Sequence, residues 1–181
     1  MISGKFIARD QVAALVADGD TVGLIGGGGL DIAFLGFGEI DQTGNVNVSK
    51  LGGLTVGPGG FVDIAQTARK MVFVGTFDAK GAKLSTGDGK LQIKTQGAVQ
   101  KLVNDVEQIT FSGRQALAQD QHGLYVTERC VFELKADGLH LIEVAPGVDL
   151  DADILDRMAF RPIIDVPPAI MSPAHFTENA K

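Results

Sequence analysis

The chain has 181 residues and a formal net charge of −6, with 45% hydrophobic and 21% charged residues. This length suits one domain, and the hydrophobic share supports a packed core and argues against disorder. The acidic balance argues against nonspecific nucleic-acid binding, which needs a clustered basic surface.

The first half of the chain predicts helices that alternate with buried strands. Asp10 is a candidate N-cap and Gly19 a C-terminal stop, with an apolar stripe between them. In chain order we predict a helix at 10–19, strands at 21–25 and 31–37, a strand through Val46 and Val48, a helix at 61–68 and a strand at 71–77.

The second half predicts antiparallel pairing around the turn sequences Asp88-Gly89 and Ala136-Asp137-Gly138. In order we predict a hairpin at 83–94, a strand within 102–111, a short helix at 113–119, a hairpin formed by 124–134 and 139–144, a helix at 151–158 and a proline-rich tail at 162–181. The sum indicates one α/β domain over residues 1–181, with a mixed sheet, flanking helices and a second half rich in antiparallel hairpins.

The rarer side chains limit the chemistry. A single cysteine, Cys130, rules out a disulfide within the chain and a cysteine-rich zinc site, and we expect it to be buried. Three scattered histidines give no metal-site spacing, and His140 is expected to be exposed in its hairpin. Glu128 and Arg129 lie in an alternating run and are expected to pair with each other.

Targeting signals are not evident. The opening residues MISGKFIARD lack the pattern of a signal peptide, and no apolar run has the length of a bilayer span. We therefore expect a cytoplasmic protein with no membrane partner.

Four consecutive glycines, residues 26–29, could suggest a phosphate-binding loop. A dinucleotide fingerprint needs a third glycine where this chain has Asp31, and a carboxylate there would repel a pyrophosphate. The Gly-Lys-Ser/Thr ending of a Walker loop is also missing. The run can equally be a tight link between two strands, and a nucleotide-binding oxidoreductase domain is the weaker alternative.

Several long blocks, taken in order, resemble one enzyme family. They are GGGLDIAFLGFGEIDQTGNVNVSK, VGPGGFVDIAQTARKMVFVGTF, VEQITFSG, YVTERCVFEL and GLHLIEVAPGVDLDADIL. Together they are similar to the C-terminal part of the family I CoA-transferases, most nearly the fused acetate/propionate type. The opening ISGKFIARDQVAALVADGDTV is similar to the start of these enzymes.

The chain departs from this family between the two pieces, with an expected junction near residues 25–28. The family's long middle section carries a catalytic glutamate in a Glu-x-Gly pattern, which none of Glu39, Glu107, Glu128 and Glu143 matches. Whether the section is absent by nature or by deletion stays open. Glu39, after Gly38 at the end of a buried strand, is a weak substitute nucleophile.

The resemblance implies covalent catalysis through a glutamyl-CoA thioester, with backbone N–H groups that stabilise each oxyanion. By resemblance, Gly60 matches a glycine of the oxyanion hole, with Gly59 beside it. Gly27, Gly28 and Gly29 would line the cleft. Asn47 and Lys50 would lie near it, where Lys50 could meet a carboxylate or a CoA phosphate. Each of these features can also be structural, as a loop entering a helix or a solvated strand end.

Two functional classes therefore remain. The chain can be a CoA-transferase portion whose nucleophile comes from missing residues or a partner chain, or a non-catalytic module that binds CoA weakly or only assembles. The expected partners are acyl-CoA and small carboxylates, with CoA as a substrate and no permanently bound cofactor. A homo-oligomer is also expected, because an exposed sheet edge favours self-association.

Overall fold

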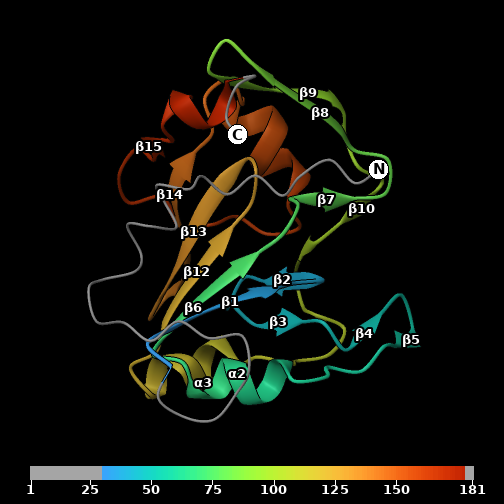
Figure 1. Cartoon of the computed structure of the whole chain (residues 1–181), viewed down its shortest axis with the longest axis vertical. Coiled ribbons are helices and arrows are strands. Elements are labelled where there is room, and N and C mark those ends of the chain that lie inside the picture. Colours follow the sequence, from blue (N-terminus) through green and yellow to red (C-terminus); the bar gives the residue numbers. More distant parts are fainter. Residues whose placement is uncertain (1–29, 178–181) are drawn as a thin grey trace.

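The computed structural model describes residues 30–177, with a six-stranded sheet at the centre (Figure 1). The strand order is β1-β6-β12-β13-β14-β15. The parallel strands are β1 (Ile32–Gly36), β6 (Lys70–Val74) and β12 (His122–Val126). They are followed by the antiparallel β13 (Cys130–Lys135) and β14 (Gly138–Val144), with the short β15 (Ala169–Ile170) parallel to β14. This is the mixed sheet that the sequence predicts.

Two helices pack on this sheet, and both begin close to the predicted residues. Helix α2 (Phe61–Thr67) contacts β1, and α3 (Gly113–Ala118) contacts β12 and β13. Ser112 caps α3 by accepting a hydrogen bond from the Gln115 amide at 3.3 Å. Phe73 of β6 packs beneath both helices, with ring centroids 6.0 Å from Phe61 and 4.8 Å from Phe111.

Smaller sheets flank the main one. β11 (Leu102–Val103), β2 (Glu39–Asp41) and β3 (Val46–Asn47) form a three-stranded sheet. The two-stranded sheets are β7 (Asp78–Ala79) with β10 (Val99–Gln100), β8 (Lys83–Gly87) with β9 (Lys90–Thr95), and β4 (Lys50–Leu51) with β5 (Leu54–Thr55). The β8–β9 hairpin turns at Asp88-Gly89, as predicted, with φ of 53° and 72°.

The predicted strand at 124–134 is wrong, because the structure divides it into β12 and β13. Thr127 closes the turn between them: its backbone N–H donates to the Cys130 carbonyl at 2.9 Å, and its Oγ1 accepts the Cys130 amide at 3.0 Å. Glu128 and Arg129 therefore lie in a buried turn and not in a strand.

The predicted helix at 151–158 is also different. A π-helical turn at Leu150–Ile154 is followed by a 3₁₀ turn at Leu155–Arg157. The Asp153 carbonyl accepts a hydrogen bond from Arg129 Nη1 at 2.9 Å, so a side chain from another segment shares a carbonyl of this turn.

The proline-rich tail wraps onto the sheet. It contributes β15 and a 3₁₀ turn at Pro173–Phe176, and it buries Met171 and Phe176. The helix at 10–19, the strand at 21–25, the junction at 25–28 and the cleft residues Gly27, Gly28 and Gly29 lie outside the described residues, so these remain predictions.

Candidate functional site

The glycine loop before α2 is open to solvent. Gly57 and Gly59 have φ of +81° and +54°, a backbone conformation that favours glycine, whereas Gly60 has an ordinary φ of −81°. The Phe61 amide donates to the Pro58 carbonyl at 3.1 Å, which closes the turn. Neither Gly59 nor Gly60 lies in a strand, so their amides are not used in sheet pairing.

Gly60 is not required by the local geometry. A Cβ placed on Gly59 or Gly60 would meet no described heavy atom within 4 Å. At Gly60 neither φ nor crowding explains the missing side chain. Gly60 is also the N-cap of α2, a position where glycine is common, so its lack of a side chain fits both a cap and a close approach by a ligand.

The loop is anchored beside the β4–β5 arm, which we define as residues 50–56. The Ser49 carbonyl accepts the amides of Val56 at 2.8 Å and Gly57 at 3.1 Å. This contact brings the predicted site residues Asn47 and Lys50 close to the start of the loop. The arm turns at Gly52-Gly53, with φ of +60° and +78°.

Asn47 holds the root of the arm. Its side chain is fully buried, and Oδ1 accepts the amides of Ser49 at 3.0 Å and Lys50 at 3.1 Å. Its Nδ2 donates to the Glu39 carboxylate at 2.7 Å and to the Lys50 carbonyl. Sequence alone gave no signal for this structural use, and a contact from Asn47 to CoA stays a prediction.

Lys50 keeps 39% of its side chain exposed and forms an ion pair with Glu107 at 3.2 Å. The Gly53 amide donates to the Glu107 carboxylate and, with Lys50, holds the pKa of Glu107 below its usual value. Glu39, the substitute nucleophile, accepts hydrogen bonds from Asn47 and from the Glu107 amide at 3.0 Å. Both glutamates therefore stabilise the arm.

A second polar cluster lies beyond the ends of β6 and β12, and the sequence revealed only part of it. Arg129 pairs with Glu128 at 3.3 Å, as expected, and more closely with Asp78 at 2.8 Å. Glu128 also accepts the Phe77 amide at 2.9 Å, while burial raises the pKa of its carboxyl group. The Gly97 amide donates to Asp78 at 2.8 Å. This network fixes the loops that follow β6 and precede β10.

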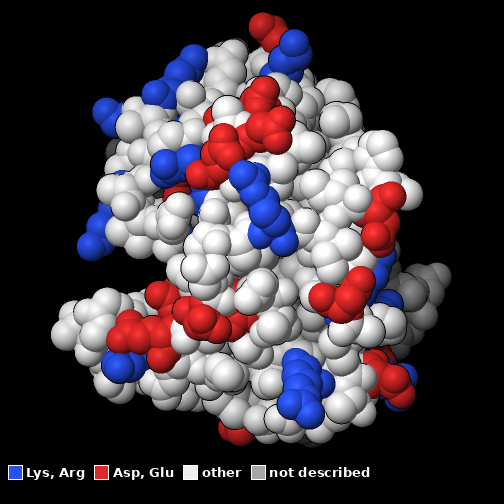
Figure 2. Space-filling model, turned by 180° about the vertical axis from the view of Figure 1, so that it is seen from behind, with Lys and Arg blue, Asp and Glu red and all other residues white. Residues whose placement is uncertain are grey.

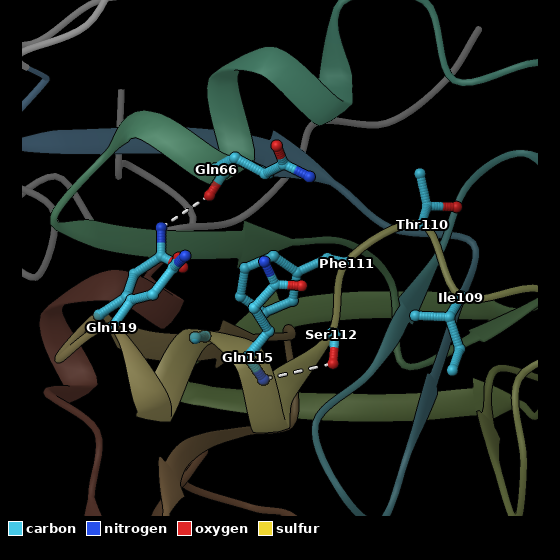
Figure 3. A pocket seen from close by; sticks show the side chains of 10 residues that line it. Gln66, Ile109, Thr110, Phe111, Ser112, Gln115 and Gln119 are labelled. Carbon is cyan, nitrogen blue, oxygen red and sulfur yellow. Dashed lines mark hydrogen bonds between the residues drawn. The ribbon is translucent and has the colours of Figure 1, made fainter.

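The cavity found among the described residues lies elsewhere, between α2 and α3 (Figure 3). It measures about 170 Å³ and has no charged residue in its lining. Gln121 supports its wall by donating to the Ala65 carbonyl at 2.6 Å. The lining residues are Ala65, Gln66, Ile109, Thr110, Phe111, Ser112, Gln115, Ala116, Gln119 and Gln121. We call this space the α2–α3 cavity; Gly59 and Gly60 do not line it.

Two other expectations were tested. Cys130 is buried, as predicted, and burial raises the pKa of its thiol. The exposed position predicted for His140 is wrong: its ring is buried between Asp137 at 2.7 Å and Asp165 at 3.0 Å, because the C-terminal tail covers it. Within residues 30–177, no group of three His, Cys, Asp or Glu side chains could hold a metal ion.

The curated relatives that match the chain are CoA-transferases, although no protein-family model matches it. The sequence is 49% identical to the acetate CoA-transferase YdiF of Escherichia coli O157:H7 over 154 residues, which are 85% of this chain and 29% of that protein. It is 46% identical to the caffeate CoA-transferase of Acetobacterium woodii over 180 residues, which are 97% of this chain and 34% of that protein. The chain thus spans about a third of the length of these relatives.

Solved structures of CoA-transferases share this fold, and so, at 20% identity and a TM-score of 0.58, does the decarboxylase AibA/AibB. The crystal structure of the YdiF apoenzyme from E. coli O157:H7 matches with a TM-score of 0.82 at 49% identity, over 84% of this chain and 30% of that one. A thioester complex of the same enzyme with CoA matches equally well. The glutaconate coenzyme A-transferase of Acidaminococcus fermentans shares the fold, with a TM-score of 0.53 at 22% identity over 80% of this chain and 55% of that one. None of the helices within residues 30–177 has the length and hydropathy of a membrane-crossing segment.

Proposed function

Because the chain is a partial homologue of the family I CoA-transferases, we propose that it forms the wall of a CoA-transferase site that stabilises the oxyanion. The substrates would be a short-chain acyl-CoA and a small carboxylate in the cytoplasm, with CoA as a substrate and not a resident cofactor. The observation that carries the proposal is the open glycine loop at Gly59 and Gly60.

In this reaction a glutamate carboxylate attacks the thioester carbonyl, which becomes a tetrahedral oxyanion. The acyl group passes to the glutamate as an anhydride while the CoA thiolate departs. The thiolate then attacks the anhydride, releases the carboxylate product and leaves a glutamyl-CoA thioester. The amides of Gly59 and Gly60 would donate to the oxyanion at each step. Removing one such donor typically costs about 3–4 kcal/mol of barrier height.

The nucleophile would come from another stretch of polypeptide. Near the glycine loop, Glu39 and Glu107 already accept backbone or side-chain hydrogen bonds in the arm. Lys50, with its exposed fraction of 39%, would be the cation that meets a carboxylate or phosphate of the substrate. Rearranging these groups for catalysis would disrupt the arm that positions the loop.

The use of both glutamates in the arm favours a second candidate, a non-catalytic module that binds CoA without transferring it. The two candidates differ in whether the chain transfers CoA to an added carboxylate. The transferase moves CoA from acetyl-CoA to propionate, with a covalent adduct visible by intact mass. The module binds CoA and gives neither product.

The site itself is tested by titrating ¹⁵N-labelled chain with CoA and acetyl-CoA. We expect the amide resonances of Gly59 and Gly60 to shift. Gly81 is the matched control, since it is also an exposed glycine with open space around it and lies outside the arm and the loop. Shifts without turnover favour the module. Unshifted Gly59 and Gly60 resonances at saturating ligand would refute the proposed site for either function.

A further inference from the structure

The β4–β5 arm holds a carboxylate of the chain itself against its glycine turn. The Gly53 amide donates to both oxygens of the Glu107 carboxylate, at 3.0 and 3.1 Å, and Lys50 Nζ lies 3.2 Å from Oε1. Glu107 reaches the turn from 54 positions along the chain. In Figure 2 the arm projects at the lower left, where red acidic residues and a blue cationic residue adjoin. A backbone donor and a cation therefore form a small anion site that is already filled.

The turn that forms this site is built from two glycines. Gly52 and Gly53 have φ of +60° and +78°, both are exposed, and a Cβ on either would meet no described heavy atom within 4 Å. Backbone N–H groups presented by such a turn bind anions. The Gly53 hydrogen bond, aided by Lys50 and the Gly52 amide, holds the pKa of Glu107 below its usual value. The site thus favours an ionised carboxylate and has open space beside it.

The Glu107 side chain can leave the site while its backbone stays in place. Its own amide donates separately to the Glu39 carboxylate at 3.0 Å. The side chains of Glu107 and Lys50 are both partly exposed, and ion pairs near the surface contribute little to stability. An incoming carboxylate would take over the contacts with Gly53 and Lys50, so the arm would keep its form during the exchange.

The site lies on the same arm that leads into the glycine loop. Strand β5 ends at Thr55, and the Ser49 carbonyl then holds the amides of Val56 and Gly57. A ligand bound at the turn would therefore sit on the element that directly precedes the loop.

We propose that Lys50 and the Gly52-Gly53 turn form a binding site for a small carboxylate, which Glu107 occupies in the ligand-free chain until an incoming carboxylate displaces it. The natural ligand, the carboxylate substrate, rests on the proposed function. The site itself does not, because its geometry is complete without CoA. Glu107 is then a built-in competitor that keeps the site closed at low carboxylate concentration.

Removing the competitor tests the site. A tethered group acts at an effective concentration in the millimolar range, so wild type should bind acetate weakly. In ¹⁵N-labelled Glu107→Ala at pH 7 and constant ionic strength, acetate should shift the Gly52 and Gly53 amide resonances saturably and toward their wild-type positions. The dissociation constant should be lower than in wild type by roughly 10-fold or more. Acetamide, the neutral isostere of acetate, should cause no such shift.

Two further variants identify the cause. Lys50→Met in the Glu107→Ala background should abolish the response to acetate, because the cation is lost. Glu133→Ala is the matched control, since Glu133 pairs with Lys135 at 3.6 Å within β13 and away from the turn. In this control Gly52 and Gly53 should respond as weakly as in wild type. Thermal unfolding of each variant shows that the fold is kept.

Three results would overturn the proposal. One is an absence of shifts at Gly52 and Gly53 of Glu107→Ala in saturating acetate. The second is equal acetate affinity in wild type and Glu107→Ala, which would mean that Glu107 does not compete. The third is an equal response to acetamide. The CoA titration of Gly59 and Gly60 is a separate measurement, so either proposal can fail while the other stands.

Discussion

Replacing Arg129 with methionine should destabilise the protein severely. The Arg129 side chain is fully buried, and it donates to Asp78 at 2.8 Å, Gln96 at 2.7 Å and the Asp153 carbonyl at 2.9 Å. A longer contact joins it to Glu128 at 3.3 Å. Methionine keeps much of the apolar volume but provides no donor, so Glu128 loses its cation and Asp78 keeps only the more distant Arg157, at 3.8 Å.

The structure places this change among the costlier substitutions. Removing one partner of a buried ion pair costs about 3–5 kcal/mol, because the remaining charge is left without compensation. Asp78 is 2% exposed and cannot turn to water, and its Oδ1 already has no hydrogen-bond partner. A domain of this size loses about 2–4 °C of melting temperature per kcal/mol. The expected decrease in melting temperature is therefore roughly 6–20 °C.

Urea unfolding of a double-mutant cycle isolates the cause. Asp78→Asn removes the stranded charge, so the Arg129→Met/Asp78→Asn protein should be more stable than Arg129→Met alone. Arg161→Met is the matched control: Arg161 pairs with Asp156 at 3.0 Å, with both side chains 63% exposed, and should lose less than about 1 kcal/mol. A loss below about 1.5 kcal/mol for Arg129→Met would refute the view that this cation compensates buried charge.

Three further predictions concern single groups. Gly60→Ala should lower the free energy of unfolding by no more than about 1 kcal/mol, the cost of alanine at an N-cap, since its φ is ordinary and the space is open. Gly59→Ala should lose about 1–2 kcal/mol because of its φ of +54°. If Gly60 lies against the substrate, Gly60→Ala should in addition weaken acetyl-CoA binding measured by calorimetry. The pKa of Glu128 is raised by burial from 4.5, so the folded state binds a proton more readily than the unfolded state. The stability of wild type relative to Glu128→Gln should therefore increase as pH falls from 7 toward 5, and a decrease over this range would contradict the direction of the shift. Tyr125→Phe should lower the free energy of unfolding in urea by about 1–3 kcal/mol, because the buried Tyr125 hydroxyl donates to the Gly44 carbonyl at 2.6 Å and the variant leaves that carbonyl unsatisfied. An unchanged urea midpoint would indicate that a water molecule replaces the hydroxyl.

Local features of the chain were predictable because their causes lie within a few residues. The Asp88-Gly89 turn needs two positive φ angles, and both residues tolerate them. The apolar run that became β6 is buried on both faces at its three central residues, as a continuous hydrophobic strand in a parallel sheet is, while the run that became the edge strand β1 is buried only at its first two residues. The family resemblance rested on the same kind of information, namely long blocks of residues in a fixed order.

The candidate site was only partly readable. The glycine bend before α2 was readable from its sequence, while its use as an oxyanion hole remains a prediction. The role of Asn47 was not, because its amide acts on Glu39 across a strand pair and on the backbone of the arm. The α2–α3 cavity was missed because its lining comes from segments more than 40 positions apart, which no local pattern connects.

By itself, the sequence determined the helices at 61 and 113, the Asp88-Gly89 hairpin and the buried strands β1 and β6, since periodicity and turn chemistry act over short distances. It did not determine the turn between β12 and β13 or the π-helical turn at Leu150–Ile154. Only the tertiary structure decided the surroundings of single polar groups. Arg129 meets Asp78 from 51 positions away, and His140 is buried because Asp165 and the tail fold back over it. Partners so distant along the chain are selected by the packing of the whole domain, because burial makes an unpaired charge or donor costly wherever its partner lies in the sequence.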